Sequence, residues 1–97
     1  MQVVCKIEKW VQQPDVQTQN GMTSKAQVVL RCLGGRNAES FVGTAFGVVA
    51  GKPMQEGTLV VAEVKFFSHE YEGKFFQDVN IFDMVALKDA NQIGEHF

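Results

Sequence analysis

Apolar and polar residues alternate along most of this chain, with the period of a β-strand that buries one face. The alternation is clearest in residues 2–12, where one face carries Val3, Cys5 and Ile7. In residues 25–33, the apolar face consists of Ala26, Val28, Leu30 and Cys32, and the other face of Lys25, Gln27, Val29 and Arg31. Residues 58–67 alternate in the same way, and residues 39–49 and 74–87 are also predicted to be strands. The pattern therefore predicts five strands and no long helix.

Turn-forming residues separate these stretches. Pro14-Asp15 and Asn20-Gly21 interrupt the pattern after residue 12, and Asn-Gly is a strong turn signal. Residues 34–37 and 68–73 are predicted to be hairpin turns, and residues 50–57 allow at most one helical turn. Residues 89–97 are polar and are expected to form a flexible C-terminal tail. The sequence thus predicts one domain, residues 1–88, followed by a tail.

Five strands of this length in fewer than 90 residues favour a small barrel. Gly43 and Gly47 lie within the third predicted strand, where glycine often marks a bulge or a sharp bend. We therefore predict an all-β fold, a five-stranded Greek-key OB-fold barrel whose helix between strands three and four is reduced to a short turn. An SH3-like barrel is the alternative, although its strands are typically shorter.

Charge is distributed unevenly along the 97 residues. The net charge is −2, but residues 1–36 hold five cations and two acids, and residues 37–97 hold four cations and nine acids. The first two strands are therefore the basic part of an acidic protein, and a local basic surface can still bind phosphate. The two cysteines, Cys5 and Cys32, are expected to be reduced and to pack as small hydrophobic side chains, which suggests a cytoplasmic location. No segment has the composition of a membrane span or a signal peptide.

Three segments, in order, resemble the single-stranded DNA-binding protein (SSB) family. They are Pro14-Asp15-Val16-Gln17 with Asn20-Gly21, Glu56-Gly57-Thr58-Leu59-Val60-Val61-Ala62-Glu63-Val64, and His69-Glu70-Tyr71-Glu72-Gly73-Lys74-Phe75-Phe76-Gln77-Asp78-Val79. The third segment is also similar to a hairpin of small SSB-related OB-fold proteins of bacteria and phages. The resemblance implies an OB fold, single-stranded DNA as the partner, a role in replication or recombination, and contacts with replication proteins.

Single-strand binding without sequence preference needs aromatic faces for base stacking and cations along the phosphates. In an OB fold, the groove is formed by strands two and three with the loops between strands one and two and between strands four and five. The residues predicted to bind nucleic acid are Trp10, Lys25, Arg31, Lys65, Phe67, His69, Tyr71, Lys74 and Phe75. Phe66, Phe76 and Phe82 are interpreted as structural, Trp10 has the alternative role of capping one barrel end, and Phe46 is assigned to neither groove nor core.

The main hypothesis is a non-catalytic protein that binds single-stranded DNA, with RNA left open as a ligand. His69 and His96 have no nucleophile or paired carboxylate assigned to them, so neither an enzyme, a cofactor nor a metal site is predicted. The alternative is an OB-like protein-interaction module without nucleic-acid binding, which the acidic net charge favours. A homodimer is expected in either case, because Val61, Phe67 and Phe75 make the outward face of strands four and five apolar.

Overall fold

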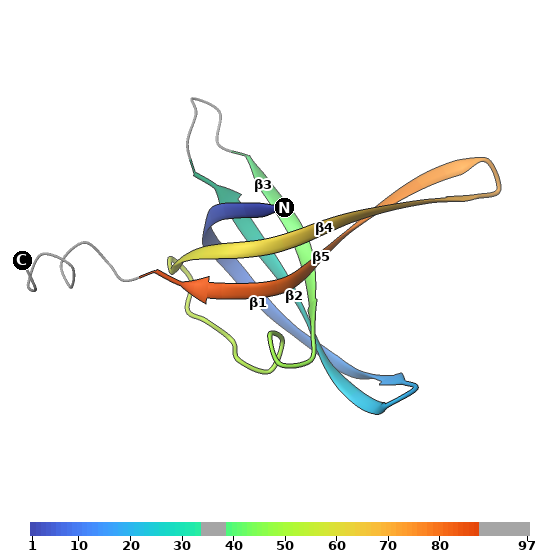
Figure 1. Cartoon of the computed structure of the whole chain (residues 1–97), viewed down its shortest axis with the longest axis horizontal. Helices are drawn as coiled ribbons and strands as arrows, with labels where there is room; N and C mark the ends of the chain where they lie inside the picture. Colours follow the sequence, from blue (N-terminus) through green and yellow to red (C-terminus); the bar gives the residue numbers. More distant parts are fainter. Residues whose placement is uncertain (34–38, 88–97) are drawn as a thin grey trace, which may run out of the picture.

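The computed structural model describes residues 1–33 and 39–87, and these residues form five β-strands (Figure 1). The strands are β1 (Gln2–Thr18), β2 (Gly21–Cys32), β3 (Ser40–Phe46), β4 (Leu59–Tyr71) and β5 (Lys74–Ala86). The five predicted strands are confirmed, although several boundaries differ. Within the described residues, no helix has the length and apolar character needed to cross a membrane. The predicted tail, residues 89–97, lies outside the described residues.

The sheet closes on itself in the order β1-β2-β3-β5-β4. All neighbouring strands are antiparallel except β3 and β5, which are parallel where Thr44 pairs with Asn80 and Ala45 with Ile81. β1 pairs with β2 along most of its length, and its segment Gln2–Lys6 also pairs with β4. This arrangement is consistent with an OB-like fold.

The sequence pattern predicted that the first strand ends before Pro14. In the structure, β1 continues to Thr18. The pairing of β1 with β2 shifts register between Gln13 and Val16, so that Pro14 and Asp15 lie in a bulge. Proline has no N–H group to donate to a neighbouring strand, and a bulge removes the need for one. A second shift, between Ile7 and Lys9, leaves Glu8 without a paired partner on β2.

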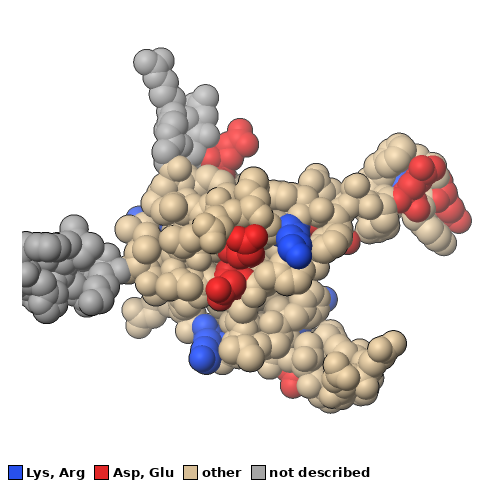
Figure 2. Space-filling model, in the orientation of Figure 1, with Lys and Arg blue, Asp and Glu red and all other residues tan. Residues whose placement is uncertain are grey.

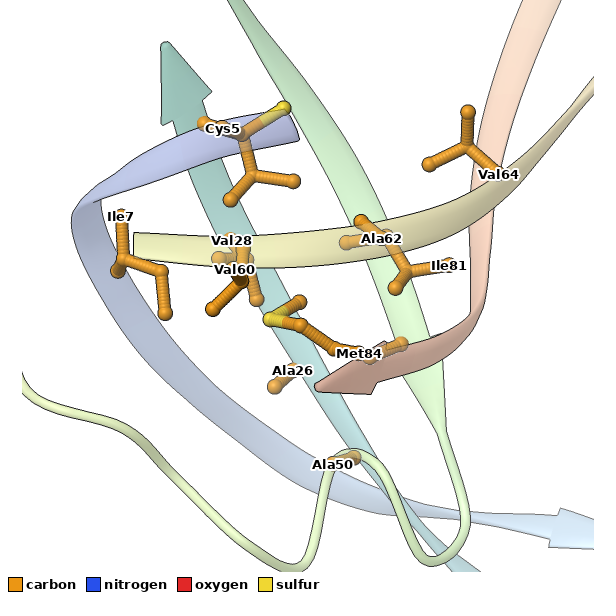
Figure 3. Close-up of a cluster of buried hydrophobic side chains, with 12 residues drawn as sticks. Cys5, Ile7, Ala26, Val28, Ala50, Val60, Ala62, Val64, Ile81 and Met84 are labelled. Carbon is orange, nitrogen blue, oxygen red and sulfur yellow. The ribbon is translucent and has the colours of Figure 1, made fainter. Parts of the chain in front are cut away.

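The core is built from small aliphatic side chains of all five strands and the β3–β4 connection (Figure 3). Its fully or almost fully buried members are Cys5, Ile7, Ala26, Val28, Leu30, Ala45, Ala50, Val60, Ala62, Val64, Ile81 and Met84. The alternation predicted for residues 25–33 and for the first half of β4 is therefore confirmed. Burial of an aliphatic side chain of this kind contributes about 1.5–3 kcal/mol.

Phe66, Phe76 and Phe82, which the sequence analysis interprets as structural, do not belong to the core of the chain. Their exposed fractions are 47%, 45% and 50%. The register of β4 and β5 shifts between Glu63 and Val64, where Phe82 is the extra residue on β5. Beyond this bulge, the hairpin that contains Phe66 and Phe76 extends past the barrel, so neither of its faces is covered by another strand (Figure 1).

The connection between β3 and β4 is a turn and not a helix, as predicted. The N–H of Gly51 donates to the carbonyl of Gly47 at 2.9 Å, and Ala50 is completely buried. Gly47 begins this turn with φ of 67°, a conformation that glycine adopts without strain. Ala50 thereby covers one end of the barrel (Figure 3).

Two hairpins project from the same side of the barrel (Figure 1). The β4–β5 hairpin turns at Glu72 and Gly73, whose φ angles are 50° and 78°. Two consecutive positive φ angles are typical of the type I′ turn, which suits the twist of a two-residue hairpin. The predicted turn at residues 68–73 is thus limited to two residues, and strands continue up to Tyr71 and from Lys74.

Candidate nucleic-acid interface

The β4–β5 hairpin carries a row of aromatic side chains on one face, which we name the outer face. Residues directly opposite each other in an antiparallel pair share a face, and successive residues alternate between faces. Pairing places Tyr71 opposite Lys74, His69 opposite Phe76, Phe67 opposite Asp78, and Lys65 opposite Asn80. These eight residues lie on the face opposite to that of the core residues Val64 and Ile81.

Ring contacts join members of this row to one another and to Phe82, the extra residue of the β5 bulge. The rings of His69 and Phe76 are stacked with centroids 5.3 Å apart, and those of Phe67 and Phe82 are tilted with centroids 6.5 Å apart. The Nζ atom of Lys65 lies 4.7 Å from the Phe82 centroid. Tyr71, near the turn, has an exposed fraction of 64%. The outer face therefore combines exposed ring surfaces with an ammonium group, the two components of a single-strand platform.

Phe75, a predicted binding residue like Phe67 and Tyr71, does not lie on the same face of the hairpin as these two. It pairs with Glu70 on the opposite face of the hairpin and is 79% exposed. Phe76, interpreted as structural from the sequence, takes its place beside His69. The missed signal was the turn: a two-residue turn at Glu72-Gly73 pairs residue 71 with 74, and therefore puts residues 69, 71, 74 and 76 on one face.

On β2, Lys25 and Arg31 alternate with the buried residues Ala26 and Leu30 and therefore point away from the core, as predicted. Lys25 pairs with Phe46 on β3, and its Nζ atom is 6.0 Å from the centroid of that ring. Phe46, which the sequence left unassigned, is therefore directed outward and is partly exposed. Arg31 forms an ion pair with Glu8 at 3.1 Å, which reduces the positive potential at that position.

The outer faces of β2–β3 and of the hairpin form one continuous surface. Gln27 pairs with Thr44, Thr44 with Asn80, and Asn80 with Lys65, so that a single row of outward residues crosses β2, β3, β5 and β4. Lys25 and Phe46 form the next row on one side, and Phe67 follows Lys65 on the other. The structure thus brings Lys25, Lys65, Phe67, His69, Tyr71 and Lys74 onto one surface.

Trp10 lies on the other side of β1 from these residues. It pairs with Val28, is half-buried and packs against the core. Its indole N–H donates to Oε1 of Gln12 at 3.2 Å. The structure therefore does not place Trp10 with Lys25 and Arg31, because a β1 residue opposite Val28 faces inward.

The end of the β4–β5 hairpin is acidic (Figure 2). Glu72 lies in the turn and Glu70 two residues before it, and Lys74 is the cation beside them. On β5, Asp78 Oδ2 lies 3.6 Å from Nδ1 of His69, an ion pair only when the imidazole is protonated. Positive charge on this surface is therefore local, at Lys25 and Lys65.

The fold changes the titration of the Glu8 carboxylate. The Ser40 hydroxyl donates to Oε1 of Glu8 and the Arg31 guanidinium donates to Oε2. Because hydrogen bonds to a carboxylate favour its charged form, the contact with Ser40, followed by that with Arg31, lowers the pKa of Glu8. In residues 1–33 and 39–87, no three His, Cys, Asp or Glu side chains come together as metal ligands.

No known protein family and no curated protein matches this sequence. Among solved structures, the chain is similar to a small single-stranded DNA-binding protein from Streptomyces coelicolor. The two are 14% identical over 95% of this chain and 94% of the other, with a TM-score of 0.51. At this identity the likeness concerns the fold, and it supports an SSB-like OB arrangement of the five strands.

Proposed function

We propose that this protein binds single-stranded DNA without catalysing a reaction, by stacking bases on the outer face of the β4–β5 hairpin. The observation that carries the proposal is the exposed aromatic row of Phe67, His69, Phe76 and Tyr71 on one face of that hairpin. Each base stacked on such a ring contributes about 1–3 kcal/mol, whatever its identity.

Phosphates would follow the continuous surface from Lys65 towards Lys25. Both cations lie beside an aromatic ring, Phe82 and Phe46 respectively, so that stacking and charge alternate along the path. The fold likeness to a single-stranded DNA-binding protein supports the same ligand class. Coating of strands exposed during replication or recombination, and contacts with replication proteins, are the roles that we propose for this activity.

Fluorescence anisotropy with labelled dT oligomers at two salt concentrations tests the proposal. We expect binding that weakens with salt, with a shallow slope because each phosphate contact contributes only about −0.7 to the slope for single strands and few cations are available. A parallel titration with rU oligomers separates DNA from RNA preference. Absence of dT binding at micromolar protein and low salt would overturn the proposal.

A protein-interaction module is the second candidate, and the acidic end of the hairpin favours it. Glu70 and Glu72 flank the exposed Tyr71 and would repel phosphates there, whereas a basic protein surface would be attracted.

We also propose that a second copy of the chain covers an outer apolar patch on β1, β4 and β5. Val4 pairs with Val61, and Val61 with Val85, while Leu59 and Leu87 lie next to this row. Glu63 and Asp83 border the patch on one side and Lys6 on the other. A two-fold axis along the Val4–Val61–Val85 row would place the basic border of one copy against the acidic border of the other.

A further inference from the structure

The two cysteines of this chain face each other across β1 and β2. Cys5 pairs directly with Cys32. The N–H of Leu33 donates to the carbonyl of Val4 at 3.0 Å, one residue beyond the pair on each strand. This hydrogen bond identifies Cys5 and Cys32 as a non-hydrogen-bonded pair, in which side chains approach most closely and the Cα atoms are about 4.5 Å apart.

That separation lies within the range of about 4.4–6.8 Å that disulfides span. Both thiols are free, and Cys32 lies near enough to Cys5 to contribute to its raised pKa. The backbone therefore needs no rearrangement to bring the two sulfur atoms together.

The two thiols differ in access to solvent. Cys5 is completely buried in the core (Figure 3), whereas Cys32, at the end of β2, is only partly buried. Burial, with a further contribution from Cys32, raises the pKa of the Cys5 thiol to about 11. An external oxidant is thus expected to react first with Cys32.

We propose that Cys5 and Cys32 are a reversible redox site, which a low-molecular-weight disulfide such as oxidised glutathione converts to an intramolecular cross-strand disulfide. The Cys32 thiolate attacks the oxidant, forms a mixed disulfide and releases one thiolate. Cys5 loses its proton to solvent and its sulfur attacks the Cys32 sulfur, which releases the second thiolate. Two protein thiols are oxidised and one small-molecule disulfide is reduced to two thiols. Under reducing conditions the pair returns to the free thiols.

The disulfide would link the first part of β1, which closes the barrel between β2 and β4, covalently to β2. The segment Gln2–Lys6 pairs with β4 on one side, and Cys5 within it pairs with β2 on the other. A disulfide at Cys5 would therefore tie to β2 the segment of β1 that pairs with β4, and this effect does not depend on the proposed nucleic-acid binding.

The test is incubation of the folded protein with excess oxidised glutathione, followed by mass spectrometry and non-reducing peptide mapping. We expect monomeric protein lighter by two hydrogen atoms, with a peptide that links Cys5 to Cys32. The melting temperature should rise by roughly 10 °C and return on addition of dithiothreitol.

Single-cysteine variants provide the controls. Cys5→Ala should accumulate a mixed disulfide at Cys32, whereas Cys32→Ala should leave Cys5 unmodified until the protein unfolds. Neither variant should show the rise in melting temperature. Three results for the wild-type protein would overturn the proposal: two free thiols, only a stable mixed disulfide at Cys32, or disulfides only between chains. These results are read from the wild-type protein and do not require the variants to fold.

Discussion

Glu8 illustrates how one unpaired position changes the chemistry of a surface. The register shift between Ile7 and Lys9 leaves Glu8 without a β2 partner, and its carboxylate instead accepts hydrogen bonds from Ser40 on β3 and Arg31 on β2. Three strands are thus joined by one side chain. The same contacts neutralise one of the cations that the sequence suggested for phosphate binding.

The lowered pKa of Glu8 predicts a pH effect with a defined sign. Since the pKa is lower in the folded state than in the unfolded chain, the stabilisation is present above the ordinary pKa of glutamate. It is lost as pH falls through the lowered folded-state value. Ser40→Ala removes the largest cause, so the Glu8 pKa measured by carboxyl NMR should rise towards its ordinary value. Ser68→Ala, an exposed serine on the hairpin, should leave the Glu8 titration unchanged.

The aromatic residues of the β4–β5 hairpin lie on different faces, and alanine substitutions on the two faces are therefore expected to affect DNA binding differently. Tyr71→Ala and Phe76→Ala should each weaken oligo-dT binding by about 1–3 kcal/mol without unfolding the barrel, because both rings lie on the outer face. Phe75→Ala is the matched control, since Phe75 is more exposed but lies on the opposite face. Equal losses for Phe75→Ala and Tyr71→Ala, measured by anisotropy, would contradict the assignment of the outer face.

At the scale of elements, the barrel depends on a close approach of β3 to β5. Only two residue pairs join these strands, Thr44 with Asn80 and Ala45 with Ile81. Gly43 precedes them, and a Cβ atom at this position would lie 2.7 Å from Cγ1 and Cδ1 of Ile81. The glycine thus allows Ile81 to fill the space against β3, and it does not mark a bulge, because the β2–β3 register runs through Gly43 without a shift.

Gly43→Ala is therefore expected to destabilise the protein. Ile81 is almost completely buried, so it cannot move aside without disturbing the core, and overpacking of this kind costs about 1–3 kcal/mol. Urea denaturation measures the change. Gly51→Ala is the control, because the nearest atom to its Cβ, the Gly47 carbonyl oxygen, would lie at an ordinary contact distance of 3.5 Å. A Gly43→Ala variant as stable as wild type would show that β5 can shift.

At the scale of the whole molecule, the two hairpins extend the barrel into an elongated shape, with principal extents of 55 × 35 × 19 Å. Exposed apolar side chains are consequently spread over both the hairpin and the barrel. The hairpin surface is the one proposed for DNA, whereas the outer apolar patch of Val4, Leu59, Val61, Val85 and Leu87 is separate from it. The protein thus has room for a dimer contact that leaves the outer face of the hairpin uncovered.

The proposed dimer predicts a change of mass in solution. Light scattering should give the mass of two chains for wild type, and Val85→Glu should reduce it to that of one, because a carboxylate would be placed in the buried row. Val48→Glu, at an exposed position in the β3–β4 turn, should remain dimeric. A monomeric wild-type protein would rule out the self-association.

The sequence by itself determined the β class, the five strands and the inward faces of β2 and of the first half of β4. These features depend on local alternation, which Ala26, Val28, Leu30, Val60, Ala62 and Val64 display without interruption. It also identified Lys25, Lys65, Phe67, His69, Tyr71 and Lys74, which the structure brings onto one surface. Their role in binding stays a prediction.

Only the tertiary structure decided which side chains are buried in the segments that follow a bulge. The inward position of Trp10, the outward position of Phe82 and the contacts of Glu8 depend on register shifts between strands, and Phe66 is exposed because its hairpin extends past the barrel. An extra residue in a strand moves each following side chain of that strand to the opposite face. Whether the strand forms such a bulge depends on contacts with a partner strand that is distant in sequence. Alternation shows that a strand has two faces, but the neighbouring strands and the closure of the sheet decide which face is covered.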